Sequence, residues 1–246
     1  MNRKYYPSIA LTIWCWCWCM VMQAQSQVAL SGLAAAGHSS NLGGYTSWSF
    51  ISSYRYDRVM ADGGLALLPS KNREPLWHGI YLQGGYALRM KERPLSIQTK
   101  YLWNKVSTEI HEMNLAITAD YSLDHWYFLL GNNYRWYGFN KSYRESNGFS
   151  GEDAIIKEPW NLLYTISFRV FPPGHNWNIA GSISNTDFFI MAQETNPMFN
   201  LKGTFSPKPG VDLFLESWYK SAGLFNIQVD YYGFFFRFGI LWNIPV

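Results

Sequence analysis

The string His38-Ser39-Ser40-Asn41 holds two residue types that could do hydrolytic chemistry. A histidine can remove the proton of a serine hydroxyl, which then attacks a carbonyl carbon, and a carboxylate usually orients that histidine. No aspartate or glutamate precedes Asp57 in the chain, and glycines flank the string at positions 37, 43 and 44. These residues fit a flexible loop. We therefore predict no catalytic site, and His38 and Ser40 remain the candidates if there is one.

The same string is similar to the His-x-Ser-Asn string of the outer-membrane lipid A deacylases. This resemblance implies that His38 would be the general base and Ser40 the nucleophile of an enzyme that modifies membrane lipid. The chain has no P-loop, GxGxxG or HExxH string, and its three cysteines all precede residue 20. We therefore expect no cofactor and no bound metal ion.

Eleven charged side chains occupy polar positions in segments where polar and apolar residues alternate. Alternate residues of an extended strand point to opposite faces, so these charges share the face opposite the apolar one. The set contains both signs, which favours pairing between neighbouring strands over a single-sign ring that would select ions. The charges expected to face the interior are Arg89, Lys100, Glu112, Asp120, Arg135, Arg169, Lys202, Asp212, Glu216, Lys220 and Arg237.

The alternation recurs along the chain after residue 25 and predicts β-strands. Between residues 233 and 243, for example, Phe234, Phe236, Phe238, Ile240 and Trp242 occupy every second position. We predict twelve strands, with ten as the alternative because the third has a weak pattern. The predicted ranges are 27–37, 45–56, 63–69, 78–89, 95–105, 111–121, 125–137, 160–170, 177–187, 198–206, 211–220 and 233–243.

Tryptophans on the apolar faces form two groups at opposite ends of the predicted strands. Trp103, Trp136 and Trp160 lie at one end, and Trp126, Trp177 and Trp242 lie at the other. At about 3.3 Å per residue and with tilted strands, the separation of Trp126 and Trp136 spans roughly 25 Å, the height of the apolar band of a membrane barrel. A soluble β-sandwich has no reason to place tryptophans at this separation.

Composition and the N-terminus indicate an exported protein. Charged residues are 15% of the 246 residues, aromatic residues are 18%, and the net charge of +3 is too small to indicate a nucleic-acid partner. Basic residues at positions 3 and 4 precede an apolar run, Ile9 to Met22, that is too short to span a membrane. We interpret residues 1–24 as a cleaved signal peptide and residues 25–246 as the mature domain.

Predicted turns differ between the two ends of the strands. The strings Lys91-Glu92-Arg93-Pro94, Leu123-Asp124, Pro172-Pro173-Gly174 and Pro207-Lys208-Pro209-Gly210 fall at one end, and mostly longer connections fall at the other. In this the mature chain resembles the outer-membrane β-barrel proteins of Gram-negative bacteria. The resemblance implies an all-β, transmembrane, antiparallel up-and-down barrel in the cell outer membrane. Its partners would be outer-membrane lipid and the barrel-assembly machinery, and its oligomeric state stays open.

Turn lengths also predict which charges meet. A two-residue turn at Leu123-Asp124 places Glu112 opposite Arg135, and the turn between Pro207 and Val211 places Lys202 opposite Glu216. The remaining positive charges predict a narrow, polar interior with a weak preference for anions. We expect a channel or a structural barrel of unknown cargo. The alternatives are a lipid-modifying enzyme and an accessory subunit of a secretion or surface-assembly system.

Overall fold

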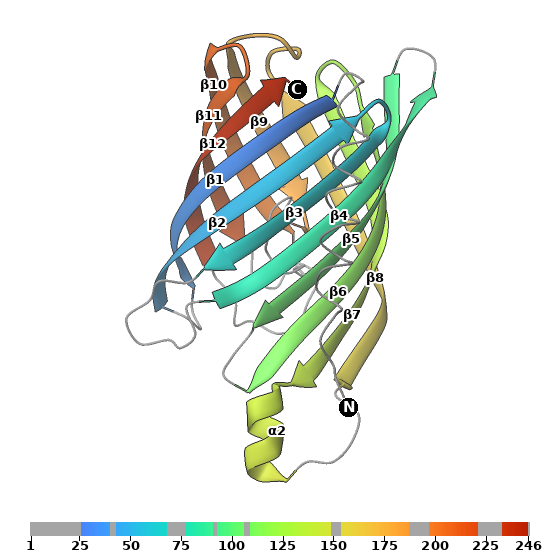
Figure 1. Cartoon of the computed structure of the whole chain (residues 1–246). Helices are drawn as coiled ribbons and strands as arrows, with labels where there is room; N and C mark the ends of the chain where they lie inside the picture. Colours follow the sequence, from blue (N-terminus) through green and yellow to red (C-terminus); the bar gives the residue numbers. More distant parts are fainter. Residues whose placement is uncertain are drawn as a thin grey trace, which may run out of the picture.

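Twelve strands form one closed sheet in the computed structural model of the chain (Figure 1). The structure describes residues 26–39, 43–67, 77–90, 93–105, 109–148, 154–186, 197–220 and 233–245. The strands are β1 Ser26–Ser39, β2 Gly43–Tyr56, β3 Val59–Leu67, β4 Trp77–Met90, β5 Arg93–Lys105, β6 Ile110–Ser122, β7 Trp126–Phe139, β8 Ala154–Arg169, β9 Trp177–Ser184, β10 Met198–Lys208, β11 Val211–Lys220 and β12 Gly233–Pro245. One helix, α2 Lys141–Asn147, follows β7.

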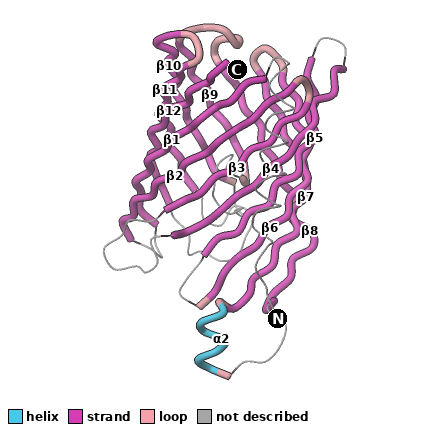
Figure 2. Tube along the Cα trace, viewed as in Figure 1, coloured by secondary structure: helices cyan, strands magenta, loops and turns pink. Residues whose placement is uncertain are grey.

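The sheet closes because β1 pairs with β12, from Gln27 opposite Pro245 to Ser39 opposite Gly233. Every other pairing joins strands that are consecutive in the chain, and all are antiparallel. Closure gives both edges of the sheet a hydrogen-bonding partner, which a strand in hydrocarbon requires. Figure 2 shows the tilted strands and the helix beyond one end of the barrel. The predicted twelve-stranded antiparallel barrel is confirmed, and the ten-strand alternative is excluded.

Short turns gather at one end of the barrel, which we call the turn end; we call the end that carries α2 the loop end (Figure 1). The strand β3 begins at Val59 rather than at residue 63, so β2 and β3 are joined by a short turn that the sequence pattern did not predict. Asp57 and Arg58 connect β2 to β3, and Asp57 has φ 48°, a left-handed conformation that aspartate tolerates better than most residues. Two further boundaries differ by three residues or more: β8 begins at Ala154 rather than 160, and β9 ends at Ser184 rather than 187.

The register between β6 and β7 differs from the prediction by two residues. Ser122 lies opposite Tyr127 rather than His125, because the Leu123 amide donates to the Trp126 carbonyl at 2.7 Å and the turn residues are 124 and 125. Glu112 therefore lies opposite Tyr137, and Arg135 lies opposite Asn114. Between β10 and β11, Lys202 lies directly opposite Glu216, as the turn length predicted.

The outer face of the barrel is apolar, with aromatic rings near both ends. At the turn end, the Trp126 ring lies 5.0 Å from that of Phe168, and Trp177 stacks on Phe205 at 4.3 Å. Trp242 is 53% exposed near the end of β12. This surface suits lipid because indole rings are amphipathic.

The three tryptophans named at the other end lie near the loop end. Trp103 stacks on His111 at 6.0 Å, Trp136 lies 5.2 Å from Tyr134, and Trp160 is 82% exposed. The His111 ring also approaches the Asn140 side chain, with Nδ1 3.1 Å from Oδ1. Aromatic rings near both ends thus flank the apolar outer surface between them.

The interior is less polar than expected. Three clusters of buried apolar residues line the interior: Leu33, Ile51, Ala66, Tyr81, Leu102 and Phe214; Ala116, Leu129 and Leu163; and Met198, Trp218 and Phe235. These residues occupy the same alternate positions along their strands as the charged residues. The alternation therefore predicts correctly which face points inwards, but it does not predict that this face is partly apolar. A small barrel fills its interior with side chains, and apolar ones pack without hydrogen-bonding partners.

Candidate pore

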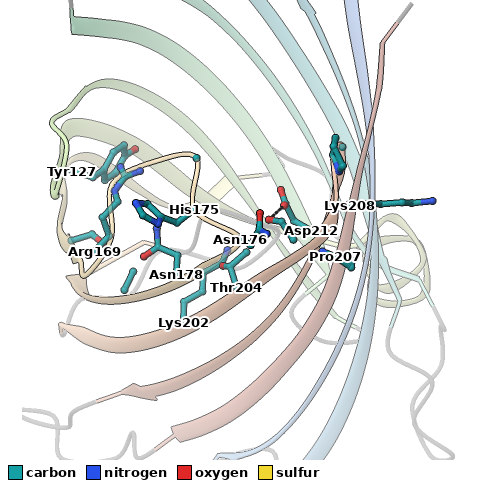
Figure 3. A pocket seen from close by; sticks show the side chains of 16 residues that line it. Tyr127, Arg169, His175, Asn176, Asn178, Lys202, Thr204, Pro207, Lys208 and Asp212 are labelled. Atoms are coloured by element: carbon teal, nitrogen blue, oxygen red, sulfur yellow. Dashed lines mark hydrogen bonds between the residues drawn. The ribbon is translucent and has the colours of Figure 1, made fainter.

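Two cavities open at the turn end of the barrel interior. The first has a volume of about 820 Å³ and is lined by residues from the turns and from β7 to β11 (Figure 3). The second has a volume of about 760 Å³ and reaches from β12 through β1 to β8. Tyr127 and Arg169 line both, so the two cavities meet at these side chains. We call the two together the vestibule.

The vestibule narrows towards the middle of the barrel. A further cavity of only about 20 Å³ lies against Leu102, Asn114 and Asn133, and it shares Lys100, Ala116 and Leu163 with the vestibule. A space of this size holds about one water molecule. Within the described part of the chain, the route from the vestibule through this cavity is therefore constricted.

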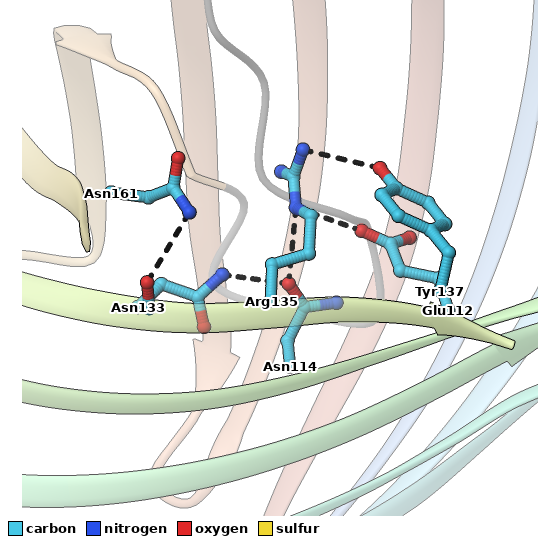
Figure 4. A network of polar contacts seen from close by, with 6 residues as sticks. All are labelled: Glu112, Asn114, Asn133, Arg135, Tyr137 and Asn161. Atoms are coloured by element: carbon cyan, nitrogen blue, oxygen red, sulfur yellow. Dashed lines mark hydrogen bonds and ion pairs between the residues drawn. The ribbon is translucent and has the colours of Figure 1, made fainter. Parts of the chain in front are cut away.

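A buried polar network lies beyond the constriction, on β6, β7 and β8 (Figure 4). Arg135 Nε lies 3.0 Å from Glu112 Oε1, and the Arg135 guanidinium also donates to Tyr137 and Asn114, each at 3.3 Å. Asn133 donates to Asn114 at 2.6 Å. The pair forms diagonally across the ladder, and arginine is long enough to span that offset. Among the described side chains, this network joins one cation to one carboxylate.

A second network on β10, β11 and β12 carries two cations for one carboxylate. Glu216 Oε1 lies 3.0 Å from Lys202 Nζ, and Glu216 Oε2 lies 3.2 Å from Arg237 Nη1. Trp218 Nε1 donates to the same Oε2 at 2.9 Å. Arg237 lies over the Phe235 ring at 5.2 Å, a favourable cation–π geometry. Among the described side chains, one carboxylate of this wall therefore holds two cations.

Carboxylates nearer the turn end accept hydrogen bonds from neutral side chains. Asp120 accepts from Ser96 and from Gln98, the latter at 2.6 Å. Asp212 accepts from Ser206 at 2.5 Å. Arg169 Nη2 donates to the Ser122 hydroxyl at 3.0 Å and lines the vestibule, as does Lys100.

Other predicted site residues are placed differently or not described. The side chains of Arg89 and Lys220 lie outside the described residues, and so does Ser40. His38 is exposed on the outer face, where its ring stacks on Phe234 at 6.3 Å. The described structure therefore gives His38 an aromatic neighbour on the membrane-facing surface.

Sequence reasoning missed several interior residues that the parity of their strands could have revealed. Phe214 lies between Asp212 and Glu216 on the same face of β11, and Phe235 shares the face of Arg237 on β12. Arg55 and Asp62 also line the vestibule. The unrecognised turn at Asp57 concealed Asp62, because residues 57–62 were interpreted as a connection. Arg55 lies within the predicted strand 45–56, so its parity could have revealed it.

The described residues contain neither a cluster of metal-ligating side chains nor a long apolar helix. No group of three or more histidine, cysteine, aspartate and glutamate side chains there is placed to hold a metal ion. No helix within the same residues is long and apolar enough to cross a membrane.

Comparison with solved structures identifies the architecture. The KdgM porin, solved in complex with disordered oligogalacturonate, is 10% identical with a TM-score of 0.51, and the match covers 86% of this chain and 98% of that one. The NanC porin is 9% identical with a TM-score of 0.50, and the same shares of the two chains are covered. The chain has the fold of an outer-membrane porin. No family model and no curated protein sequence matches it.

Proposed function

We propose that this porin-like barrel is a narrow outer-membrane channel for small anions. The placement of Lys202, whose Nζ lies 3.0 Å from Glu216 Oε1 on the interior wall, is the observation that carries the proposal. Lys202 also lines the vestibule, so its charge meets a solute that enters from the turn end. In a narrow interior of low dielectric, the charged side chains that line the entrance strongly affect which ions enter.

Further support comes from the position of the other cations. Arg169 stands where the two parts of the vestibule meet, and Lys100 stands where the vestibule meets the constriction. Anions that enter the vestibule would pass both side chains. The KdgM porin, which has a similar fold, was solved in complex with disordered oligogalacturonate, and an anionic ligand of this kind suits such a lining.

The protein lies in the outer membrane with a defined orientation. Residues 1–24 direct export and are removed, and the barrel-assembly machinery inserts the remaining chain into the outer membrane. The turn end faces the periplasm, because short turns of outer-membrane barrels lie on that side. The vestibule then opens to the periplasm.

The test is electrical. Purified protein in a planar bilayer should give small single-channel currents, and in a KCl gradient the reversal potential should show that chloride crosses more readily than potassium. A large cation-selective conductance would contradict the proposal, and so would the absence of any current from correctly folded protein.

A further inference from the structure

Two aromatic side chains of the interior lie flat against the wall because each covers a glycine. Tyr81 of β4 lies directly opposite Gly64 of β3, and Phe214 of β11 lies directly opposite Gly239 of β12. A Cβ atom on Gly64 would lie 2.7 Å from Tyr81 Cε1. One on Gly239 would lie 2.3 Å from Phe214 Cζ. Real Cβ atoms do not approach other atoms so closely, so neither ring could keep its place over any residue larger than glycine.

A lysine ammonium group lies over each of these rings. Lys100 Nζ is 4.9 Å from the centroid of the Tyr81 ring, and Lys202 Nζ is 4.1 Å from that of Phe214. The order of glycine, ring and lysine follows β3, β4 and β5 at one place and β12, β11 and β10 at the other. A cation within about 6 Å of a ring face is attracted to it. The lysine thus helps hold each ring down against the wall.

Both rings belong to one apolar cluster, together with Leu33, Ile51, Ala66 and Leu102, which runs along the inner wall from β11 through β1 to β5. Tyr81 is 3% exposed and Phe214 is 6% exposed, so each is packed rather than free to turn. Leu102 lies opposite Tyr81 in the β4–β5 ladder and also borders the 20 Å³ cavity. The cluster therefore reaches the constriction.

We infer that the Tyr81–Gly64 and Phe214–Gly239 pairs set the bore of the channel and hence the size of solute that it passes. This inference rests on the proposed function. Each glycine keeps its ring close to the wall. Tyr81 lines the vestibule, and Phe214 lies beneath Lys202, which lines it too, so the space left in the interior depends on how close the two rings lie to the wall. A ring forced off its glycine would stand into the interior and narrow it. A ring removed altogether would widen it.

Substitution of either glycine by alanine tests whether a displaced ring narrows the channel. Gly239→Ala and Gly64→Ala should each reduce single-channel conductance by about half or more, because the new methyl group displaces the ring towards the axis. Gly203→Ala is the matched control, since no atom lies within 4 Å of the position of its Cβ on β10. Its conductance should equal that of the wild type. Heat-dependent mobility on gels, which reports folded barrel, should be checked for every variant.

Removal of both rings tests whether their loss widens the channel. The double variant Tyr81→Ala, Phe214→Ala should raise conductance about twofold or more and admit larger solutes in a liposome-swelling assay. Phe238→Ala removes an aromatic ring from the outer face of β12, where Phe238 is 54% exposed, and should leave both readouts unchanged.

The outcomes separate this inference from the proposed function. If the wild type conducts but prefers cations, and the variants still change the bore in both directions, only the anion channel fails. If the folded wild type is silent, the double variant should open a current, and silence in both overturns the inference. Unchanged conductance in the glycine and the aromatic variants overturns it as well.

Discussion

At the scale of single residues, Glu216 holds two cations on one wall of the interior. It is 3% exposed and lies within 3.2 Å of both Lys202 and Arg237. The sequence predicted its pairing with Lys202, because a turn length fixes the residue that is directly opposite. The sequence did not predict the second pairing, with Arg237, which lies directly opposite Glu216 on β12. A long connection joins β11 to β12, and the strand pattern does not say which residues of the two strands it places opposite each other.

Glu216→Gln should destabilise the barrel and increase its preference for anions. The variant leaves two cations in a buried site without their carboxylate, which costs about 3–5 kcal/mol in the free energy of unfolding. Urea unfolding in lipid vesicles measures the first effect, and the reversal potential measures the second.

Glu145→Gln is the control for this substitution. The Lys141–Glu145 pair of α2 is separated by 3.7 Å with side chains that are 80% and 67% exposed, so its loss should change the free energy of unfolding by less than about 1 kcal/mol. Equal effects of the two substitutions would show that Glu216 does not hold a buried ionic network.

At the scale of elements, alternation predicted most strands but not their register. A shift of two residues keeps every side chain on its face, so the error between β6 and β7 left no trace in the pattern. The position of the turn sets the register between β6 and β7. The string Leu123-Asp124-His125 does not specify which two residues form that turn. The Asp57-Arg58 turn was missed for the related reason that it lacks glycine and proline.

Asp57→Val should weaken the β2–β3 hairpin. A β-branched side chain at φ 48° costs about 1–2 kcal/mol, because its Cβ crowds the backbone in the left-handed region. Asp57→Gly should be neutral or stabilising, and Arg58→Val is the matched control at a position without positive φ. Unfolding midpoints in urea measure all three. Equal midpoints for the valine variants at 57 and 58 would exclude strain at this turn.

At the scale of the whole molecule, stability depends on the seam between β1 and β12. This ladder joins the two ends of the sheet and runs from Gln27 opposite Pro245 to Ser39 opposite Gly233. No local pattern specifies it, because β1 and β12 are the strands most distant in sequence. The even strand number and the two aromatic groups predicted closure only indirectly, since an open sheet would expose unpaired backbone groups to hydrocarbon.

A disulfide across this seam should form spontaneously on oxidation. Ala34 and Phe238 lie directly opposite each other and both point outwards, and Cα atoms of such antiparallel partners are about 4.5–5.5 Å apart, within the range a disulfide spans. With residues 1–24 removed, the chain has no cysteine, so Ala34→Cys, Phe238→Cys introduces the only pair. The oxidised form should show altered mobility on denaturing gels, reversed by reductant. Pairing Ala34→Cys with Phe234→Cys, four residues or about 13 Å further along β12, should give no such species. Efficient cross-linking of that second pair would mean that the barrel closes in another register.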